Sequence, residues 1–164
     1  MSTVSARNGN GATGHIIDSL VAVDGTSSHA HANGLSTVGV SHDARPLGNL
    51  ADMAHCSALL LVTPAQHLRK SLERLPETDA PLLLCSKGIE AGTQMLVSEI
   101  VAELRPDNPL AVLSGPTFAH EVAAGKPTAI TLACESEALG KLLMRLVATP
   151  AFRPYWSDDV VGAE

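Results

Sequence analysis

From residue 57 onward, short apolar runs alternate with segments whose apolar residues follow helical spacing. The run SALLLVT at 57–63 is followed by PAQHLRKSLERL at 64–75, where Leu68, Leu72 and Leu75 fall on one helical face. A short continuous apolar run is typical of a strand covered on both faces, and parallel sheets are built from such strands. The alternation therefore predicts an α/β fold with a doubly wound and mostly parallel sheet.

The same alternation continues through the rest of the chain. Pro154 lies in the last apolar segment and cannot donate to a strand ladder, so this segment is expected at a sheet edge. Gly115-Pro116 is expected to begin a short helix that ends at Gly125 and Pro127. The predicted strands are 57–63, 80–86, 110–115, 127–134 and 151–157, and the predicted helices are 64–75, 93–104, 116–124 and 135–148.

Residues 1–50 lack this pattern. Small and polar residues dominate there, the segment HIIDSLVAV at 15–23 fits neither period, and residues 27–39 are typical of a loop. We therefore expect two regions. Residues 1–46 form an irregular or degenerate N-terminal segment, and residues 47–164 form an α/β domain.

The segment GNGATG at 9–14 matches the spacing G-x-G-x-x-G of dinucleotide-binding loops. A working loop needs a buried strand directly before it and an acidic residue about 20 positions later. The preceding VSARN does not predict a strand, and Asp24 comes too early and Asp43 too late. We interpret GNGATG as a chance match within a flexible N-terminal segment.

Composition narrows the function classes. The net charge of −6 argues against nucleic acid or a membrane surface as partner. No apolar stretch reaches the roughly 18 residues of a membrane span, and no secretory signal is recognisable. The three cysteines match no zinc pattern and suggest free thiols in a reducing compartment, which predicts a cytoplasmic protein. His29 and His31 lack a third ligand, so no metal site is expected.

Polar residues follow three of the predicted strands, where a parallel sheet binds ligands. Lys87 comes directly after LLLCS, so its ammonium is either a solvated loop charge or meets a phosphate or carbonyl oxygen. Thr117 lies in the first turn of the predicted helix after Gly115-Pro116. It either begins an ordinary helix or offers a hydroxyl and free N–H groups to an anionic ligand.

Taken together, three segments carry a family resemblance. They are APLLLCSKGIEAGT, AVLSGPTFAHEVAAGKPTAITLA and FRPYWSDDVVGAE. These segments closely resemble the NAD(P)-dependent glycerol-3-phosphate dehydrogenases of bacteria, which carry corresponding blocks in the same order. The resemblance covers about residues 47–164, and its SGPTFAHEV block is highly specific. It implies that residues 47–164 are the second part of an NAD(P)-binding, Rossmann-like domain whose first βαβ unit is doubtful.

The resemblance implies reversible hydride transfer between NAD(P)H and dihydroxyacetone phosphate, giving glycerol 3-phosphate for phospholipid synthesis. The cofactor would be NAD or NADP. Lys87 resembles the family lysine that touches both cofactor and substrate. Gly115 and Thr117 resemble the pair that contacts the substrate. Ala119 resembles the position where the backbone meets the cofactor, and Pro64 resembles the strand-end proline beside the nicotinamide half.

Two departures from the family bear on activity. The family's G-x-G-x-W-G is not recognisable before residue 47, which suggests a shifted reading frame or a domain that lost its first βαβ unit. The lysine of the family's G-G-A-x-K-N block, its presumed catalytic acid/base, would lie beyond Glu164, so we expect no catalytic residue in this chain. The helical domain that usually carries the family's homodimer contacts would lie there too.

Three functions therefore remain open. The chain is an incomplete, weakly active or inactive dehydrogenase, a remnant that binds nucleotide weakly, or a protein-interaction module whose partner meets open strand edges.

Overall fold

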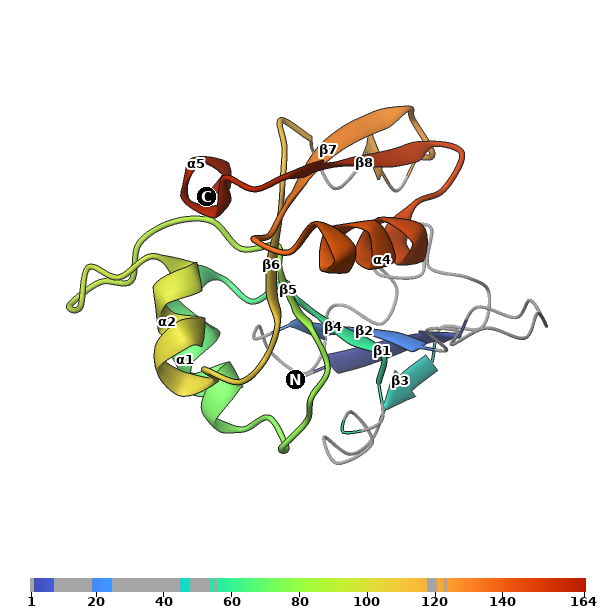
Figure 1. Cartoon of the computed structure of the whole chain (residues 1–164). Coiled ribbons are helices and arrows are strands. Elements are labelled where there is room, and N and C mark those ends of the chain that lie inside the picture. Colours follow the sequence, from blue (N-terminus) through green and yellow to red (C-terminus); the bar gives the residue numbers. More distant parts are fainter. Residues whose placement is uncertain are drawn as a thin grey trace.

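The computed structural model describes residues 2–7, 19–24, 45–47, 54, 56–117, 121–122 and 124–164. The described strands form one eight-stranded sheet in the order β3-β1-β2-β4-β5-β6-β7-β8 (Figure 1). Their bounds are Ser2–Arg7 (β1), Ser19–Asp24 (β2), Arg45–Leu47 (β3), Ala58–Leu61 (β4), Leu82–Leu84 (β5), Leu110–Ser114 (β6), Thr128–Ala133 (β7) and Phe152–Ser157 (β8).

The centre of the sheet is parallel. Strand β2 pairs in parallel with β4, β4 with β5, and β5 with β6, whereas β1 runs antiparallel to both β2 and β3. Strand β7 runs antiparallel to β6 and parallel to β8. The carboxyl ends of β4, β5 and β6 therefore meet at one edge, which is where ligands bind to sheets of this kind.

Leucine-rich runs form these central strands because both faces of the sheet are covered. Leu82 and Leu84 of β5 belong to the apolar cluster under α1 (Ala65–Glu73) and α2 (Val97–Leu104). Leu83 between them belongs to the opposite cluster, with Leu143 of α4 (Glu137–Val147). Successive strand residues point to opposite faces, so a run without polar interruption suits a two-sided core.

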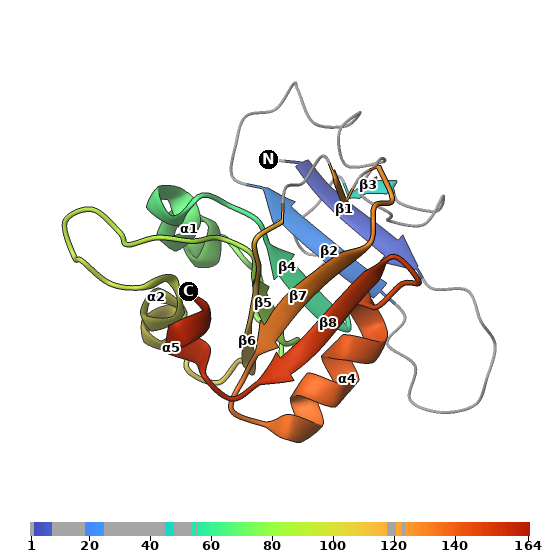
Figure 2. The ribbon, with the colours of Figure 1, turned by 90° about the horizontal axis from the view of Figure 1, so that it is seen from above.

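The helices are divided between the two faces (Figure 2). Helices α1 and α2 lie side by side on one face, where Val160 and Ala163 of the short α5 (Val160–Ala163) also pack. Helix α4 covers the other face, next to β7 and β8. The predicted doubly wound, mostly parallel α/β fold is confirmed.

Two features differ from the sequence prediction: the start of one helix and the direction of one strand. Helix α2 begins at Val97 instead of residue 93, because Ile89 and Leu96 form an isolated antiparallel bridge that closes a loop between them. The antiparallel β7 needs no crossover helix, since it starts at the end of the sheet where β6 finishes. Within the predicted helix 116–124, residues 121 and 122 are helical and most others lie outside the described residues.

The sequence pattern predicts no strand in residues 1–50, and this prediction is wrong. Strand β1 directly precedes the GNGATG segment, and β2 ends at Asp24, in register with β4 through the pair Val23 and Leu61. Residues of mixed polarity form these strands by pairing with neighbours, because strand formation depends on context more than on local pattern. GNGATG itself lies outside the described residues. Since β1 and β2 are antiparallel, they do not form a parallel βαβ pair.

The predicted edge position of the last strand is confirmed, since β8 ends the sheet order. Its Trp156 lies over Gly140 of α4, where an added Cβ would come within 2.2 Å of the Trp156 Cδ1 atom. The Trp156 Nε1–H group donates to the Cys134 carbonyl oxygen at 3.1 Å. A glycine at position 140 therefore lets α4 approach the edge of the sheet.

Candidate functional site

The predicted site residues that the structure describes lie at the carboxyl ends of neighbouring strands. Pro64 follows β4, Lys87 follows β5, and Gly115 and Thr117 follow β6. The parallel pairings of β4 with β5 and β5 with β6 bring these ends to one edge of the sheet. Ala119, the remaining predicted residue, lies outside the described residues.

Pro64 marks the step from β4 into α1. It occupies the N-cap position of the helix, where its missing N–H costs no hydrogen bond, and its carbonyl accepts from His67 N–H at 2.8 Å. The next residue, Ala65, faces the loop after β5: a Cβ added at Gly88 would lie 3.9 Å from the Ala65 Cβ. Ala65 and Gly88 therefore lie close together. Pro64 directly precedes Ala65, and Lys87 directly precedes Gly88.

Lys87 is exposed, and in the part of the chain that the structure describes its ammonium forms no hydrogen bond or ion pair. The preceding residue anchors the chain. Ser86 is buried, and its hydroxyl donates to the Leu61 carbonyl oxygen at 3.3 Å and to the Thr63 carbonyl oxygen. The loop therefore has a fixed base and presents a cation at the edge of the sheet.

The loop from Lys87 to Leu96 is held by a buried acid, Glu90. The Arg69 side chain donates to its carboxylate through Nε at 3.0 Å and Nη2 at 3.0 Å, and the Thr93 hydroxyl donates at 2.6 Å. Hydrogen bonding to Arg69, and then to Thr93, holds the pKa of Glu90 below its usual range. The pKa of Arg69 is raised by the same pairing. Glu90 is therefore an ionised structural anchor.

The exposed Gln66 of α1 makes a second connection to this loop. Its Nε2 donates to the Ile89 carbonyl oxygen at 2.7 Å, and its Oε1 accepts from the Ala91 N–H at 2.8 Å. The two bonds flank Glu90 on the loop backbone. Nothing in the sequence pattern reveals either connection, because their partners lie more than 20 positions apart.

After β6 the chain is held by close packing. A Cβ added at Gly115 would lie 3.1 Å from Ile130 Cγ1 and 3.4 Å from Ile130 Cα, so the glycine lets this turn press against β7. The Thr117 N–H donates to the Gly115 carbonyl oxygen at 2.8 Å, and Thr117 is half-buried. Position 115 is therefore restricted by packing, whatever ligand contact it makes.

Glu164 connects α5 to α2, and the sequence pattern does not reveal this contact. Its carboxylate accepts from the backbone N–H of Ser98 at 2.8 Å and from the Ser98 hydroxyl at 2.6 Å. Ser98 lies in the first turn of α2, where free N–H groups favour a negative charge. Glu164 thereby fixes α5 to the helix that follows the Lys87 loop.

The cysteines offer no reactive thiol at this site. Cys85 precedes Ser86, and burial raises the pKa of its thiol to about 12, so it is protonated at neutral pH. Cys56 and Cys134 are buried and form no disulfide. Among the described residues no cluster could hold a metal ion, and no helix is long and apolar enough to cross a membrane. His29 and His31 lie outside those residues.

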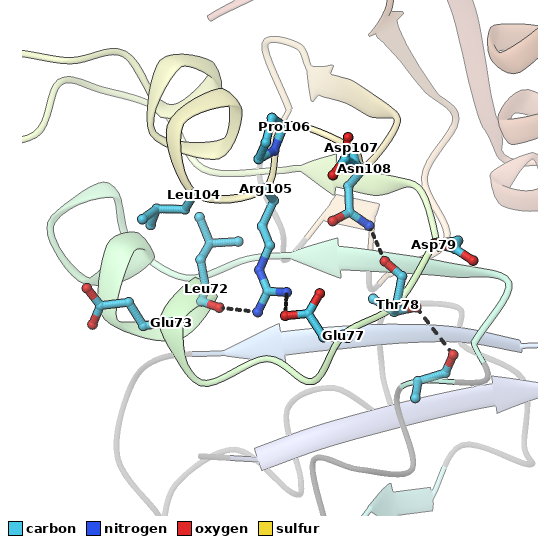
Figure 3. Close-up of a pocket in the computed structure, with 11 residues that line it drawn as sticks. Leu72, Glu73, Glu77, Thr78, Asp79, Leu104, Arg105, Pro106, Asp107 and Asn108 are labelled. Atoms are coloured by element: carbon cyan, nitrogen blue, oxygen red, sulfur yellow. Dashed lines mark hydrogen bonds and ion pairs between the residues drawn. The ribbon is translucent and has the colours of Figure 1, made fainter.

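A groove of about 680 Å³ lies at the opposite end of the strands (Figure 3). It includes residues that precede β5 and β6, and the predicted site residues do not line it. Its charged rim is mainly acidic, with Glu73, Glu77, Asp79 and Asp107. Its Arg105 is occupied by Glu77 and by the carbonyl oxygens of Leu72 and Leu75. This groove would repel an anionic dinucleotide. The better candidate for a ligand site is the edge of the sheet at the carboxyl ends of β4, β5 and β6, here called the Lys87 edge.

Comparison with known proteins identifies the family to which the chain belongs. The family model of the NAD-dependent glycerol-3-phosphate dehydrogenase N-terminus matches residues 2–140. A protein of Erythrobacter litoralis named glycerol-3-phosphate dehydrogenase (NAD(P)+) is 48% identical over 147 residues, which cover 90% of this chain and 44% of that protein. The protein of the same name from Novosphingobium aromaticivorans is 56% identical over 117 residues, covering 71% and 35%.

Solved structures show the same likeness. The crystal structure of glycerol-3-phosphate dehydrogenase from Coxiella burnetii matches with a TM-score of 0.62 and 31% identity, over 69% of this chain and 35% of that one. The structure of the yeast Saccharomyces cerevisiae enzyme matches with a TM-score of 0.58 and 26% identity, over 70% and 36%. The chain spans about half or less of the length of these relatives.

Proposed function

Because the chain belongs to the NAD-dependent glycerol-3-phosphate dehydrogenase family, we propose that it binds NAD or NADP at the carboxyl edge of β4, β5 and β6. The observation that carries this proposal is Lys87. An exposed ammonium without a protein partner among the described residues, fixed at its base by buried Ser86, suits a negatively charged ligand. The other candidate residues, Pro64, Gly115 and Thr117, are uncharged and would not repel such a ligand.

A ligand contact is proposed for each site residue. Lys87 contacts both the dinucleotide and the phosphorylated substrate. Gly115 and Thr117 contact the substrate, Ala119 meets the cofactor through its backbone, and Pro64 lies beside the nicotinamide half. The bound dinucleotide supplies or accepts the hydride, and the Lys87 ammonium stabilises negative charge that develops on a nearby substrate oxygen.

The activity proposed for the whole enzyme is reversible conversion between dihydroxyacetone phosphate and glycerol 3-phosphate, for phospholipid synthesis. Two features support it: the relatives carry that enzyme name, and Gly115 and Thr117, near the start of the SGPTFAHEV block, follow β6. The chain spans 44% of the Erythrobacter protein. We propose that this stretch alone binds dinucleotide with weak or no turnover.

Three finer proposals accompany this one. The buried Cys134, which forms no disulfide, supports a cytoplasmic location, where thiols stay reduced. A homodimer is proposed by likeness to the family, and sedimentation of the chain at several concentrations tests it. Residues 47–164 are proposed as the second part of the dinucleotide-binding domain.

The proposal is tested by following the fluorescence of NADPH during titration with the whole chain. Wild type should saturate, and Lys87→Ala should bind about tenfold more weakly through loss of a charge-assisted hydrogen bond. Lys141→Ala removes an exposed lysine paired with Glu137 on α4, so its affinity should equal that of wild type. No saturation at about 1 mM NADPH would refute the proposal, since binding that weak is worth only about 4 kcal/mol.

A second titration, with dihydroxyacetone phosphate present, tests the substrate contacts. If Lys87 and Thr117 hold the substrate beside the dinucleotide, Thr117→Val should remove any gain in NADPH affinity that the substrate produces. An equal gain in both proteins would contradict the role of Thr117. Thermal unfolding of Thr117→Val serves as the control for folding.

A further inference from the structure

The geometry points to Gln66 as a positioning residue: from helix α1, it holds the loop that presents Lys87 to the dinucleotide. This inference rests on the proposed dinucleotide site. Gln66 itself is not placed against the ligand. It acts through the backbone of Ile89 and Ala91, at 2.7 and 2.8 Å from its amide atoms.

The Gln66 amide matches the loop backbone at two points. One end donates to a carbonyl and the other accepts from an N–H group, so both polar functions of the side chain are used. The paired backbone groups belong to residues on either side of Glu90. The clamp therefore fixes both the position and the orientation of the peptide segment just after Lys87-Gly88.

The loop needs such a clamp because its own backbone is unusual. Gly88 has φ +113° and Gly92 has φ +97°, and Gln94 has φ +60° although it is not glycine. Glycine adopts positive φ readily, which also leaves the free loop with many alternative conformations. External contacts must select one of these conformations before Lys87 is presented in a single place.

Gln66 differs from the neighbouring Arg69 in what it stabilises. Arg69 neutralises the buried carboxylate of Glu90, so its removal affects folding as well as loop position. Gln66 is exposed and pairs only with exposed loop backbone. Its loss leaves no charged group buried, so loop position can be tested without a large change in stability.

Gln66 also connects the two proposed cofactor contacts. It lies in the first turn of α1, which Pro64 begins, and its bonds reach the loop that carries Lys87. The approach of Ala65 to Gly88 lies beside it. The first turn of α1 thereby holds the segments after β4 and β5 in a fixed relation.

The test combines amide hydrogen exchange with NADPH titration of the whole chain. In the free protein, Gln66→Ala should speed exchange at Ala91 by about three- to tenfold, the effect of losing one hydrogen bond, with an unchanged unfolding midpoint. NADPH should bind about fivefold more weakly. Gln66→Met, which removes both polar atoms of the side-chain amide, should behave alike. Glu73→Gln, on the last turn of α1, is the control and should match wild type.

A double-mutant cycle with Lys87→Ala separates positioning from direct contact or general packing. If Gln66 acts through Lys87, Gln66→Ala should have no further effect on NADPH affinity in the Lys87→Ala protein. An equal loss in both backgrounds, or no loss in either, would overturn the inference while leaving the proposed function intact. Failure of the wild type to bind NADPH would overturn the proposed function, and the inference with it.

Discussion

The two faces of the sheet are held together in different ways. Under α1 and α2, an apolar core is supplemented by polar connections between distant residues: Arg69 with Glu90, Gln66 with Ile89 and Ala91, and Ser98 with Glu164. Under α4, the described contacts are mainly apolar, and one close approach between Gly140 and Trp156 is central.

This difference between the two faces decides which contacts can be predicted from the local sequence. Packing on the α4 face depends on residue size and helical spacing, which a local pattern reveals. Two of the polar connections on the α1 and α2 face, those of Arg69 and Gln66, hold the Lys87 loop, and all three depend on pairs that only the folded chain brings together. The loop that carries the proposed ligand contact Lys87 is therefore held by contacts between residues distant in sequence.

The largest effect expected concerns the α4 face. Gly140→Ala places a Cβ 2.2 Å from Trp156 Cδ1, so the ring must move and its bond to Cys134 is strained. We expect a loss of about 2 kcal/mol in unfolding free energy from overpacking, despite the better helix propensity of alanine. Urea unfolding measures it. In a Trp156→Val background the loss should shrink, and a full loss there would show that the ring is not the cause.

A smaller effect is expected at the Lys87 loop. Gly88→Ala forces a Cβ onto a residue with φ +113°, although the nearest atom leaves room at 3.9 Å. Backbone strain alone should cost about 1–2 kcal/mol of unfolding free energy. NADPH affinity should fall as well, because Lys87 is adjacent. If affinity is unchanged while stability falls, the loop conformation does not matter for binding, and the contrast between the faces weakens.

The ion pair of Glu90 with Arg69, on the face covered by α1 and α2, should make stability depend on pH. The lowered pKa of Glu90 gives a stabilisation that is complete above the ordinary glutamate pKa of about 4.3 and is lost as pH falls through the lower folded value. Glu90→Gln removes this contribution. The difference in urea midpoint between wild type and variant should therefore shrink on going from about pH 7 to about pH 3. A difference that stays constant with pH would mean that the ion pair is not its source.

The smallest effect is expected at Glu103, the other acid bound to Arg69. Its side chain is 50% exposed, and exposed ion pairs contribute little to stability. Glu103→Gln should leave both the urea midpoint and the NADPH affinity unchanged. A loss comparable to that of Glu90→Gln would show that Arg69 depends on both acids, so that the loop is held by a network instead of one buried pair.

The central fold could be predicted from the sequence because its strands are unbroken apolar runs. SALLLVT and APLLLCS gave strands with nearly correct positions, and Pro154 correctly marked an edge. Strands β1 and β2 were missed because mixed residues such as STVSAR carry no period of their own. The start of α2 was misplaced because the Ile89–Leu96 bridge is a tertiary contact.

The candidate site was predictable only in outline. The rule that ligands bind beyond parallel strands located Lys87, Gly115 and Pro64 at one edge, and the structure places their strands next to one another. Gln66 and Glu164 could not be found, because a glutamine on a helix or a carboxylate after a turn has no distinctive local pattern. Their roles depend on partners that lie 25 and 66 positions away.

The most direct test of the central claim is amide chemical-shift mapping of the whole 17.0 kDa chain during titration with NADPH. The dinucleotide site proposed at the Lys87 edge predicts saturable shifts at Thr63, Gln66, Lys87, Ala91 and Gly115. Shifts that gather instead at Thr78, Asp107 and Asn108, in the acidic groove at the opposite end of the strands, would contradict it. So would a spectrum that does not change at all.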